Sequence, residues 1–333
     1  MLCSTRTREA RGRRPGLART RRVGALLAVA CLGLPGVAQA ATKPAVTTGG
    51  AANITPTSVR LTGTVDPNGA ATEYQFQYGP TTAYGQVTPP LQVTGDGVKT
   101  ITVDVEGLAP ATRYYYRLVA RNSAGETVGA RRSFRTLRQP LGIELAASPN
   151  PVVYGGGATI AGRVTGTGAG GRTVVLQSNP FPFTQGFQNA GNAQIADAQG
   201  NFAFPLLFVP FNAQYRVVLL DRPNVASPIV TLNVAVRVNA RVGTNRVRKG
   251  SLLTFQGTIQ PAIDGSLLSV QRKDSKGRWV KVGGMAARHS NSKQSKFKRR
   301  VRIRRTGTYR VYATVANGQY AEAASREFRI RVK

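Results

Sequence analysis

Apolar and polar residues alternate one by one in short runs along most of the chain from residue 44 onward. Val59 and Leu61 alternate with Arg60, and the same period of two recurs at residues 74–78 and 101–105. Alternation over four to eight residues indicates a β-strand with one buried face and one solvent-exposed face. The pattern therefore predicts a chain of half-buried strands.

Turn-forming residues separate these runs. Residues 66–69 read Asp-Pro-Asn-Gly, and these residue types favour tight turns. Roughly seven such runs fall within about a hundred residues, a density typical of a β-sandwich. The chain is therefore predicted to be all-β and built from tandem antiparallel β-sandwiches.

A more specific motif lies in residues 44–137. It reads Leu108-x-Pro110-x-Thr112-x-Tyr114-x-Tyr116, continues as Ala-Arg-Asn-Ser-Ala-Gly over 120–125, and closes with a strand at 133–136. On these residues the segment resembles a bacterial fibronectin type III module. The resemblance implies a tyrosine corner, in which the hydroxyl of Tyr114 bonds back to the backbone. It implies little about function, because many functions share this fold.

The remainder of the chain contains two segments that resemble each other. The matching pairs are Gly155 with Gly250, Gly162 with Gly257, 174–177 with 268–271, and 214–217 with 308–311. The constant offset of 94 or 95 residues is the length of one sandwich. Both segments resemble bacterial immunoglobulin-like repeats, although convergent strand and turn patterning would produce part of the similarity.

The first 40 residues predict an export signal. An Arg-rich stretch over 5–22 precedes an apolar stretch over 23–37, and small residues follow to Ala40. This order is typical of a cleavable secretory signal with cleavage after Ala40. A membrane anchor fits less well, because Pro35 and Gly36 interrupt an apolar stretch that is short of the ~20 residues of a span. Arg21-Arg22 leaves twin-arginine export open beside the general route.

These patterns predict four segments that differ in charge. They are a signal peptide at 1–40, a fibronectin type III-like domain at 41–138, an immunoglobulin-like sandwich at 139–237 and a basic immunoglobulin-like sandwich at 238–333. The formal net charge of the chain is +32. Residues 241–333 contribute +19 of it, with 23 basic and four acidic residues. The last segment is therefore where an anionic partner is expected.

Candidate chemistry is scarce. Cys3 and Cys31 both precede the cleavage point, so the exported chain is predicted to lack disulfides, thiolate metal sites and a Cys nucleophile. Gly166, Gly168 and Gly171 have the spacing of a dinucleotide loop, but a strand follows where that motif needs a helix. A hairpin loop is predicted there, and no cofactor.

The titratable residues do not form a recognisable catalytic or metal-binding set. His289 is the sole histidine and stands in a polar stretch, where a solvated loop position is expected. Asp104 and Glu106 share a strand face between valines, as in an ordinary amphipathic strand. The sequence therefore predicts a non-enzymatic protein with no catalytic residues and no metal.

A basic run near the C-terminus suggests a ligand. Apolar residues at 297, 301 and 303 keep strand alternation within it. The candidates for polyanion binding are the cations that project from the opposite face, Lys296, Lys298, Arg300, Arg302 and Arg304. Such rows attract polyanions by releasing counterions.

Three considerations weaken this interpretation. A second basic row at 327–333 belongs to the opposite sheet in an immunoglobulin-like order, so the two rows are not expected to converge. Basic edge strands also protect sheets from pairing with one another. Trp279 and Tyr309 are expected in the core, which leaves few aromatic residues for base stacking.

The function predicted first is that of a secreted or cell-surface binding protein whose basic last module contacts an anionic polymer. Teichoic-type polymers, acidic polysaccharides, lipid headgroups and extracellular nucleic acid all have suitable charge. The first alternative is a structural spacer or assembly subunit without a ligand. The second alternative is a carbohydrate-binding accessory protein.

Overall fold

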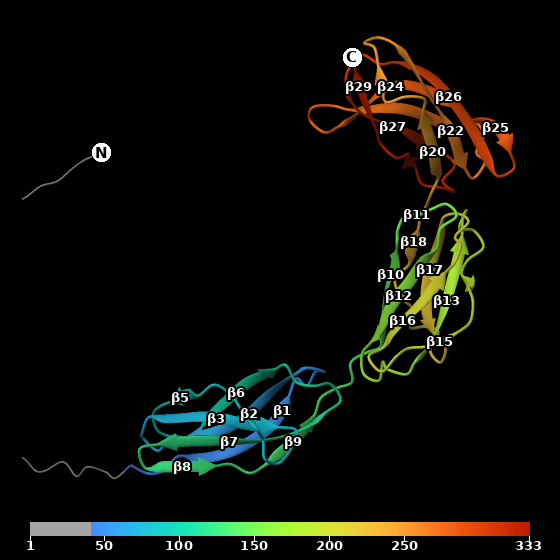
Figure 1. Cartoon of the computed structure of the whole chain (residues 1–333). Coiled ribbons are helices and arrows are strands. Elements are labelled where there is room, and N and C mark those ends of the chain that lie inside the picture. Colours follow the sequence, from blue (N-terminus) through green and yellow to red (C-terminus); the bar gives the residue numbers. More distant parts are fainter. Residues whose placement is uncertain (1–40) are drawn as a thin grey trace, which may run out of the picture. The chain divides into compact units, whose positions relative to one another are not determined.

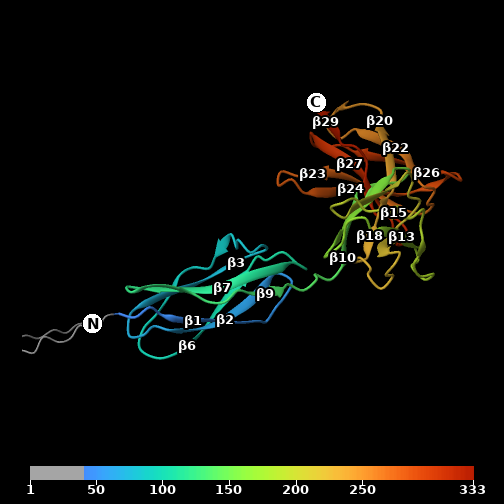
Figure 2. The same cartoon turned by 90° about the horizontal axis from the view of Figure 1, so that it is seen from below.

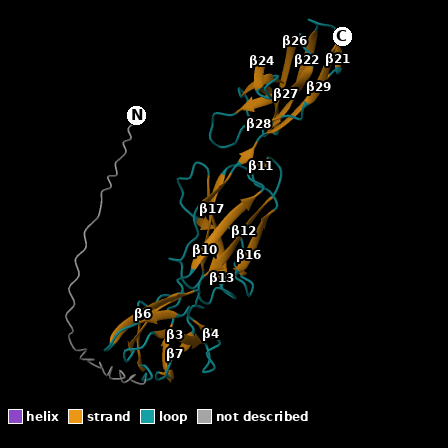
Figure 3. Cartoon of the chain, turned by 90° about the vertical axis from the view of Figure 1, so that its left-hand side faces the viewer, coloured by secondary structure: helices purple, strands orange, loops and turns teal. Residues whose placement is uncertain are grey.

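The computed structural model describes residues 41–333, and all regular structure in that range is β-strand (Figure 3). The strands form three sandwiches, each with its own apolar core (Figure 1). The predicted all-β class and tandem sandwich architecture are thereby confirmed. The predicted signal peptide, with Cys3, Cys31 and the cleavage point after Ala40, lies outside the described residues. Residues 41–333 also contain no helix with the length and apolarity of a membrane span.

The first sandwich pairs a three-stranded sheet, β1-β2-β6, with a sheet of order β4-β3-β7-β8 to which β5 and β9 add (Figure 2). Its strands are β1 (Ala45–Ala52), β2 (Ser58–Asp66), β3 (Thr72–Gly79), β4 (Gln86–Val87), β5 (Leu91–Val93), β6 (Lys99–Glu106), β7 (Arg113–Asn122), β8 (Gly125–Val128) and β9 (Arg132–Arg135).

Alternation along these strands produces the first core as predicted. Leu61 and Phe76 are fully buried, and they come from opposite sheets. The turn after β2 also forms, since the Asn68 amide donates to the Asp66 carboxylate at 3.0 Å. Asn68 and Gly69 both have positive φ there, which Asn and Gly tolerate better than other residues.

The tyrosine corner closes the same sandwich. The backbone amide of Ala109 donates to the Tyr114 hydroxyl at 2.9 Å, and the Tyr114 ring stacks on Phe134 with 5.6 Å between centroids. Tyr114 therefore bonds back to the backbone as the resemblance implied.

The second sandwich pairs a sheet of order β10-β12-β16 with one of order β14-β13-β17-β18, to which β15 adds, and has a short parallel pair β11-β19. Its strands are β10 (Gly142–Ser148), β11 (Val152–Val153), β12 (Ala158–Thr165), β13 (Thr173–Pro180), β14 (Gln188–Asn189), β15 (Gln194–Ile195), β16 (Asn201–Leu206), β17 (Ala213–Leu219), β18 (Val230–Leu232) and β19 (Val234–Ala235).

The glycine string of this sandwich corrects one prediction. Gly166, Gly168 and Gly171 lie between β12 and β13, and all three have positive φ. These strands belong to different sheets, so the segment is a connection between sheets and not the predicted hairpin loop. A strand follows it, as expected from the sequence.

The third sandwich pairs a sheet of order β20-β22-β26-β25 with one of order β21-β29-β27-β23-β24, to which β28 adds. Its strands are β20 (Arg237–Val242), β21 (Arg246–Val247), β22 (Leu252–Gln260), β23 (Leu267–Lys273), β24 (Trp279–Ala286), β25 (Arg288–Asn291), β26 (Gln294–Arg302), β27 (Gly307–Thr314), β28 (Ala323–Ala324) and β29 (Phe328–Val332).

The second and third sandwiches repeat each other in register. Gly162 lies opposite Phe202 between β12 and β16, and Gly257 lies opposite Phe297 between β22 and β26. In both pairs the aromatic ring occupies the space that a Cβ on the glycine would need. The matched glycines of the sequence therefore have the same structural role.

Candidate anion-binding face of the third sandwich

The predicted basic row lies on strand β26. Phe297 and Val301 of this strand are buried against the core, at 3% and 5% exposure. Because side chains alternate across a strand, the even-numbered residues of β26 from 296 onward point away from this core. These outward residues are Lys296, Lys298, Arg300 and Arg302, and all four are exposed. Arg304 is exposed as well, but it lies two residues beyond the end of the strand.

Two neighbouring strands add cations that the sequence analysis did not select. Arg237 and Arg241 of β20 are exposed on either side of the buried Val238. Arg288 of β25 lies directly opposite Lys296. The alternation around Val238 was the available signal, but only the sheet order places β20 next to β22 and one strand away from β26.

We call this surface the cationic face. It comprises Arg237, Arg241, Arg288, Lys296, Lys298, Arg300 and Arg302.

No carboxylate neutralises the cationic face within residues 41–333. The four ion pairs in that range join Arg60 with Asp104, Arg172 with Asp221, Arg278 with Asp274, and His289 with Asp264. None of them includes a residue of the face. Unpaired cations at this density repel one another in the folded state, so the fold is not the reason for their presence.

A column of uncharged polar side chains divides the cationic face. We call Thr254, Gln256, Thr258 and Gln260 of β22 the neutral column. Gln256 lies between Arg241 and Lys298. All four side chains are half-buried, and none makes a hydrogen bond with another residue of the range 41–333. They are therefore free to bond to a ligand.

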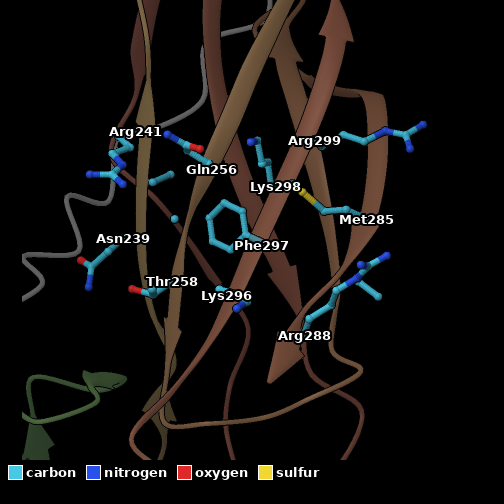
Figure 4. Close-up of a pocket in the computed structure, with 13 residues that line it drawn as sticks. Asn239, Arg241, Gln256, Thr258, Met285, Arg288, Lys296, Phe297, Lys298 and Arg299 are labelled. Atoms are coloured by element: carbon cyan, nitrogen blue, oxygen red, sulfur yellow. The ribbon is translucent and has the colours of Figure 1, made fainter. Parts of the chain in front are cut away.

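A hollow of about 950 Å³ lies along this part of the sheet. Asn239 and Arg241 border it on one side, and Met285, Arg288 and Arg299 on the other (Figure 4). Its lining also includes Gln256, Thr258, Lys296 and Lys298. Both cationic strands and the neutral column thus contribute to one depression.

The second sandwich provides an internal comparison. In its equivalent sheet, Ala146, Ala161 and Ala203 stand side by side on β10, β12 and β16. The residues in the same register of the third sandwich are Arg241, Gln256 and Lys298. The same sheet therefore forms from three alanines, and the cations are not a requirement of the fold.

The equivalent sheet of the first sandwich differs in another way. Arg60 of β2 makes a two-pronged contact with Asp104 of β6, at 2.7 and 2.8 Å. That contact lowers the pKa of Asp104, mainly through the hydrogen bond from Arg60. Asp104 is thus held by an ion pair with Arg60. These two opposite charges on the sheet β1-β2-β6 therefore balance each other.

The second basic row is separate, as predicted. Arg329 and Arg331 belong to β29, and β29 lies in the sheet opposite to that of β26. The two rows therefore occupy different sheets. Arg329 and Arg331 are useful as matched controls, since they are exposed cations of the same sandwich.

His289 is not in a loop, which corrects the prediction from sequence. It lies on the edge strand β25, and its Nδ1 is 3.0 Å from a carboxylate oxygen of Asp264. The other oxygen of Asp264 accepts from the buried hydroxyl of Ser295 at 2.5 Å. Both bonds lower the pKa of Asp264, and the bond from the Ser295 hydroxyl contributes more than the bond with His289.

This cluster does not have the order of a hydrolytic triad. Such a triad needs the serine bonded to the histidine, so that the imidazole can remove its proton. Here the serine hydroxyl donates to the carboxylate and accepts from the Ile263 amide at 2.9 Å. Ser295 is also fully buried. The geometry fits a structural clasp between the loop after β22 and strands β25 and β26.

Trp279 also lies elsewhere than predicted, whereas Tyr309 is in the core at 2% exposure. Trp279 is half-buried at the start of β24, with the Arg310 guanidinium 4.0 Å from its ring centroid. It belongs to the sheet opposite the cationic face. Trp279 therefore provides no stacking surface beside the basic row.

Comparison with known proteins identifies the first sandwich. Residues 44–135 match the family model of the fibronectin type III domain. This confirms that the motif containing Tyr114 belongs to a fibronectin type III domain. No curated protein matches the chain.

Comparison with solved structures finds matches of low sequence identity. The sensor domain of the anti-sigma factor RsgI4 of Pseudobacteroides cellulosolvens is 21% identical, with 28% of this chain and 89% of that chain covered and a TM-score of 0.23. A tetra-tandem repeat from the extending region of a large adhesion protein is 12% identical, with 87% and 75% covered and a TM-score of 0.27. The FN1–FN3 domains of chicken CNTN1 are 12% identical, with 86% and 95% covered and a TM-score of 0.28.

Proposed function

We propose that this chain, whose residues 44–135 match the fibronectin type III domain, is an exported binding protein without catalytic activity. Its third sandwich binds anionic polymers through the cationic face. The export signal predicted for residues 1–40 would deliver the protein to the outside of the cell, where the ligand would be met.

One observation carries the proposal. Where the second sandwich has Ala146, Ala161 and Ala203, the third has Arg241, Gln256 and Lys298 in the same register. Protection against edge pairing explains cations on the edge strands β20 and β25, but it does not explain the polar and cationic residues of the inner strands β22 and β26. A ligand that spans the strands explains both.

The test is the salt dependence of binding to an immobilised polyanion such as poly(glycerol phosphate). Replacing Lys298, Arg300, Arg302 and Arg304 by Gln removes four positive charges from one row. Each lost phosphate contact reduces the slope of log affinity against log salt by roughly 0.7 to 0.9. We expect the slope to fall by roughly two to four, and the affinity at low salt to fall at least about tenfold.

A matched variant separates this effect from net charge. Replacing Lys276, Lys281, Arg329 and Arg331 by Gln also removes four charges from the third sandwich, but none of them from the sheet of β26. We expect this variant to retain most of the wild-type slope. Equal slopes for the two variants, or a flat slope for the wild type, would favour a structural spacer.

A further inference from the structure

We infer that the neutral column recognises the hydroxyl groups of a phosphodiester polymer built from polyol units, while the cationic face holds its phosphates. This inference rests on the proposed function and adds the chemical class of the ligand. It depends on the order of side chains across the sheet, in which uncharged donors and acceptors lie between two cationic strands.

The rows across the sheet define the pattern. One row runs Arg241, Gln256, Lys298, and the next runs Asn239, Thr258, Lys296 with Arg288 beyond. Adjacent strands are about 4.8 Å apart, so the cationic strands β20 and β26 lie roughly 10 Å from each other. A single extended polymer chain fits above β22 with cations on both sides.

The spacing along β26 matches a short phosphodiester repeat. Successive outward residues on a strand are about 6.8 Å apart, which is the distance from Lys296 to Lys298 along the backbone. An extended chain covers about 3.5 Å for each three bonds, so the six bonds between phosphorus atoms in a glycerol phosphate polymer cover about 7 Å. One phosphate can therefore lie near each cation of the strand.

The uncharged groups of the neutral column distinguish this polymer from a bare polyanion. Gln256 can donate and accept, and so can the hydroxyl of Thr258. Neither has a side-chain partner within residues 41–333, and both line the hollow beside β26. A polyol hydroxyl between two phosphates would lie level with Gln256 and Thr258 and form hydrogen bonds with these side chains.

Nucleic acid has the same number of bonds between phosphates, but it needs aromatic surfaces on which the bases can stack. The outward residues of β20, β22 and β26 include no aromatic side chain. Phe297 lines the hollow, but it is 3% exposed and packs in the core, so its ring offers no open face for stacking. The observations therefore favour a polyol phosphate over a single-stranded nucleic acid.

The experiment compares two probes that differ in hydroxyl groups. The full exported chain and the double variant Gln256→Ala, Thr258→Val are titrated with poly(glycerol phosphate) and with inorganic polyphosphate, which has no hydroxyl groups along its chain. Each of the two substitutions removes the side-chain group that would bond to the polymer. We expect the double variant to bind poly(glycerol phosphate) about fivefold to a hundredfold more weakly and polyphosphate within twofold of the wild type.

The control for the double variant is a threonine substitution outside the third sandwich. Thr102→Val changes an exposed outward threonine of the first sandwich and should leave both affinities unchanged. An equal loss for both probes, no loss for either, or tighter binding of a single-stranded oligonucleotide than of poly(glycerol phosphate) would overturn the inference. If the four-Gln variant at 298–304 still lowers the salt slope in those cases, the proposed function stands without it.

Discussion

Gly257 shows how one residue determines the local path of the sheet. A Cβ at this position would overlap the backbone oxygen of Asn239 on β20 and would stand 2.9 Å from Cζ of Phe297 on β26. Neither neighbour can yield easily, because one is backbone and the other is a buried ring. The glycine thus lets three strands approach closely below the hollow. Gly162 has the same surroundings in the second sandwich.

Replacing Gly257 by Ala should therefore destabilise the third sandwich. We expect the free energy of unfolding to fall by about 1–3 kcal/mol, the usual cost of forcing extra volume into a packed site. Denaturant unfolding followed by the fluorescence of Trp279, the one tryptophan of the chain, measures this directly. Gly243→Ala is the control, since its Cβ would meet open space. Equal midpoints for the two variants would contradict the packing argument.

Among the strands, the local sequence pattern predicted which residues form a strand, but it did not predict which strands lie beside one another. The alternation around Phe297 predicted the outward row of β26, because side-chain direction in a strand is set by adjacent residues. The position of β20 beside β22 depends on pairing between distant segments, so Arg237 and Arg241 were not selected. Trp279 was misplaced because sequence does not tell which face of β24 carries a large aromatic residue.

One pair of side chains recurs in all three sandwiches. In each sandwich an arginine donates to a glutamine on the neighbouring strand and covers an aromatic ring. The hydrogen-bonded pairs are Arg117 with Gln77, Arg216 with Gln177 and Arg310 with Gln271, and the rings are Tyr84, Phe187 and Trp279. The first sandwich therefore has the same arrangement as the second and third, although the repeat in the sequence joins only the second and third sandwiches.

The clasp at Asp264 allows a prediction for strands β25 and β26. The Ser295 hydroxyl, and secondly His289, hold the pKa of Asp264 below its ordinary value of about 3.9. A lowered folded pKa adds stability that is complete above the unfolded pKa and is lost as pH falls through the folded value. The third sandwich should accordingly lose stability as the solution is acidified below about pH 4.

Ser295→Ala should raise the pKa of Asp264 toward the ordinary value, and a carbon NMR titration of the carboxyl group measures it. Asp274 is the internal control, because its pKa is lowered mainly by the backbone amide of Arg278 and should stay unchanged. An Asp264 pKa that Ser295→Ala leaves unmoved would show that the hydroxyl is not the cause.

For the whole molecule, the sequence shows where positive charge is concentrated along the chain, and the structure shows which of these charges share a surface. The sequence locates 23 of the 46 basic residues in 241–333, but it leaves open whether they share a surface. The sheet order brings six of them together with Arg237 on one face, without a carboxylate partner among the described residues. Register between distant strands was the missing information, since period-two patterns do not encode pairing partners.

Lysine footprinting of the unaltered protein shows whether an anionic polymer binds to the cationic face. Lysines are acetylated with and without poly(glycerol phosphate), and the extent of modification is read by mass spectrometry. We predict that Lys296 and Lys298 become several-fold less reactive when the polymer is bound, while Lys276 and Lys281, which do not belong to the cationic face, react as before. Equal protection of all four lysines, or protection of the second pair alone, would contradict the account.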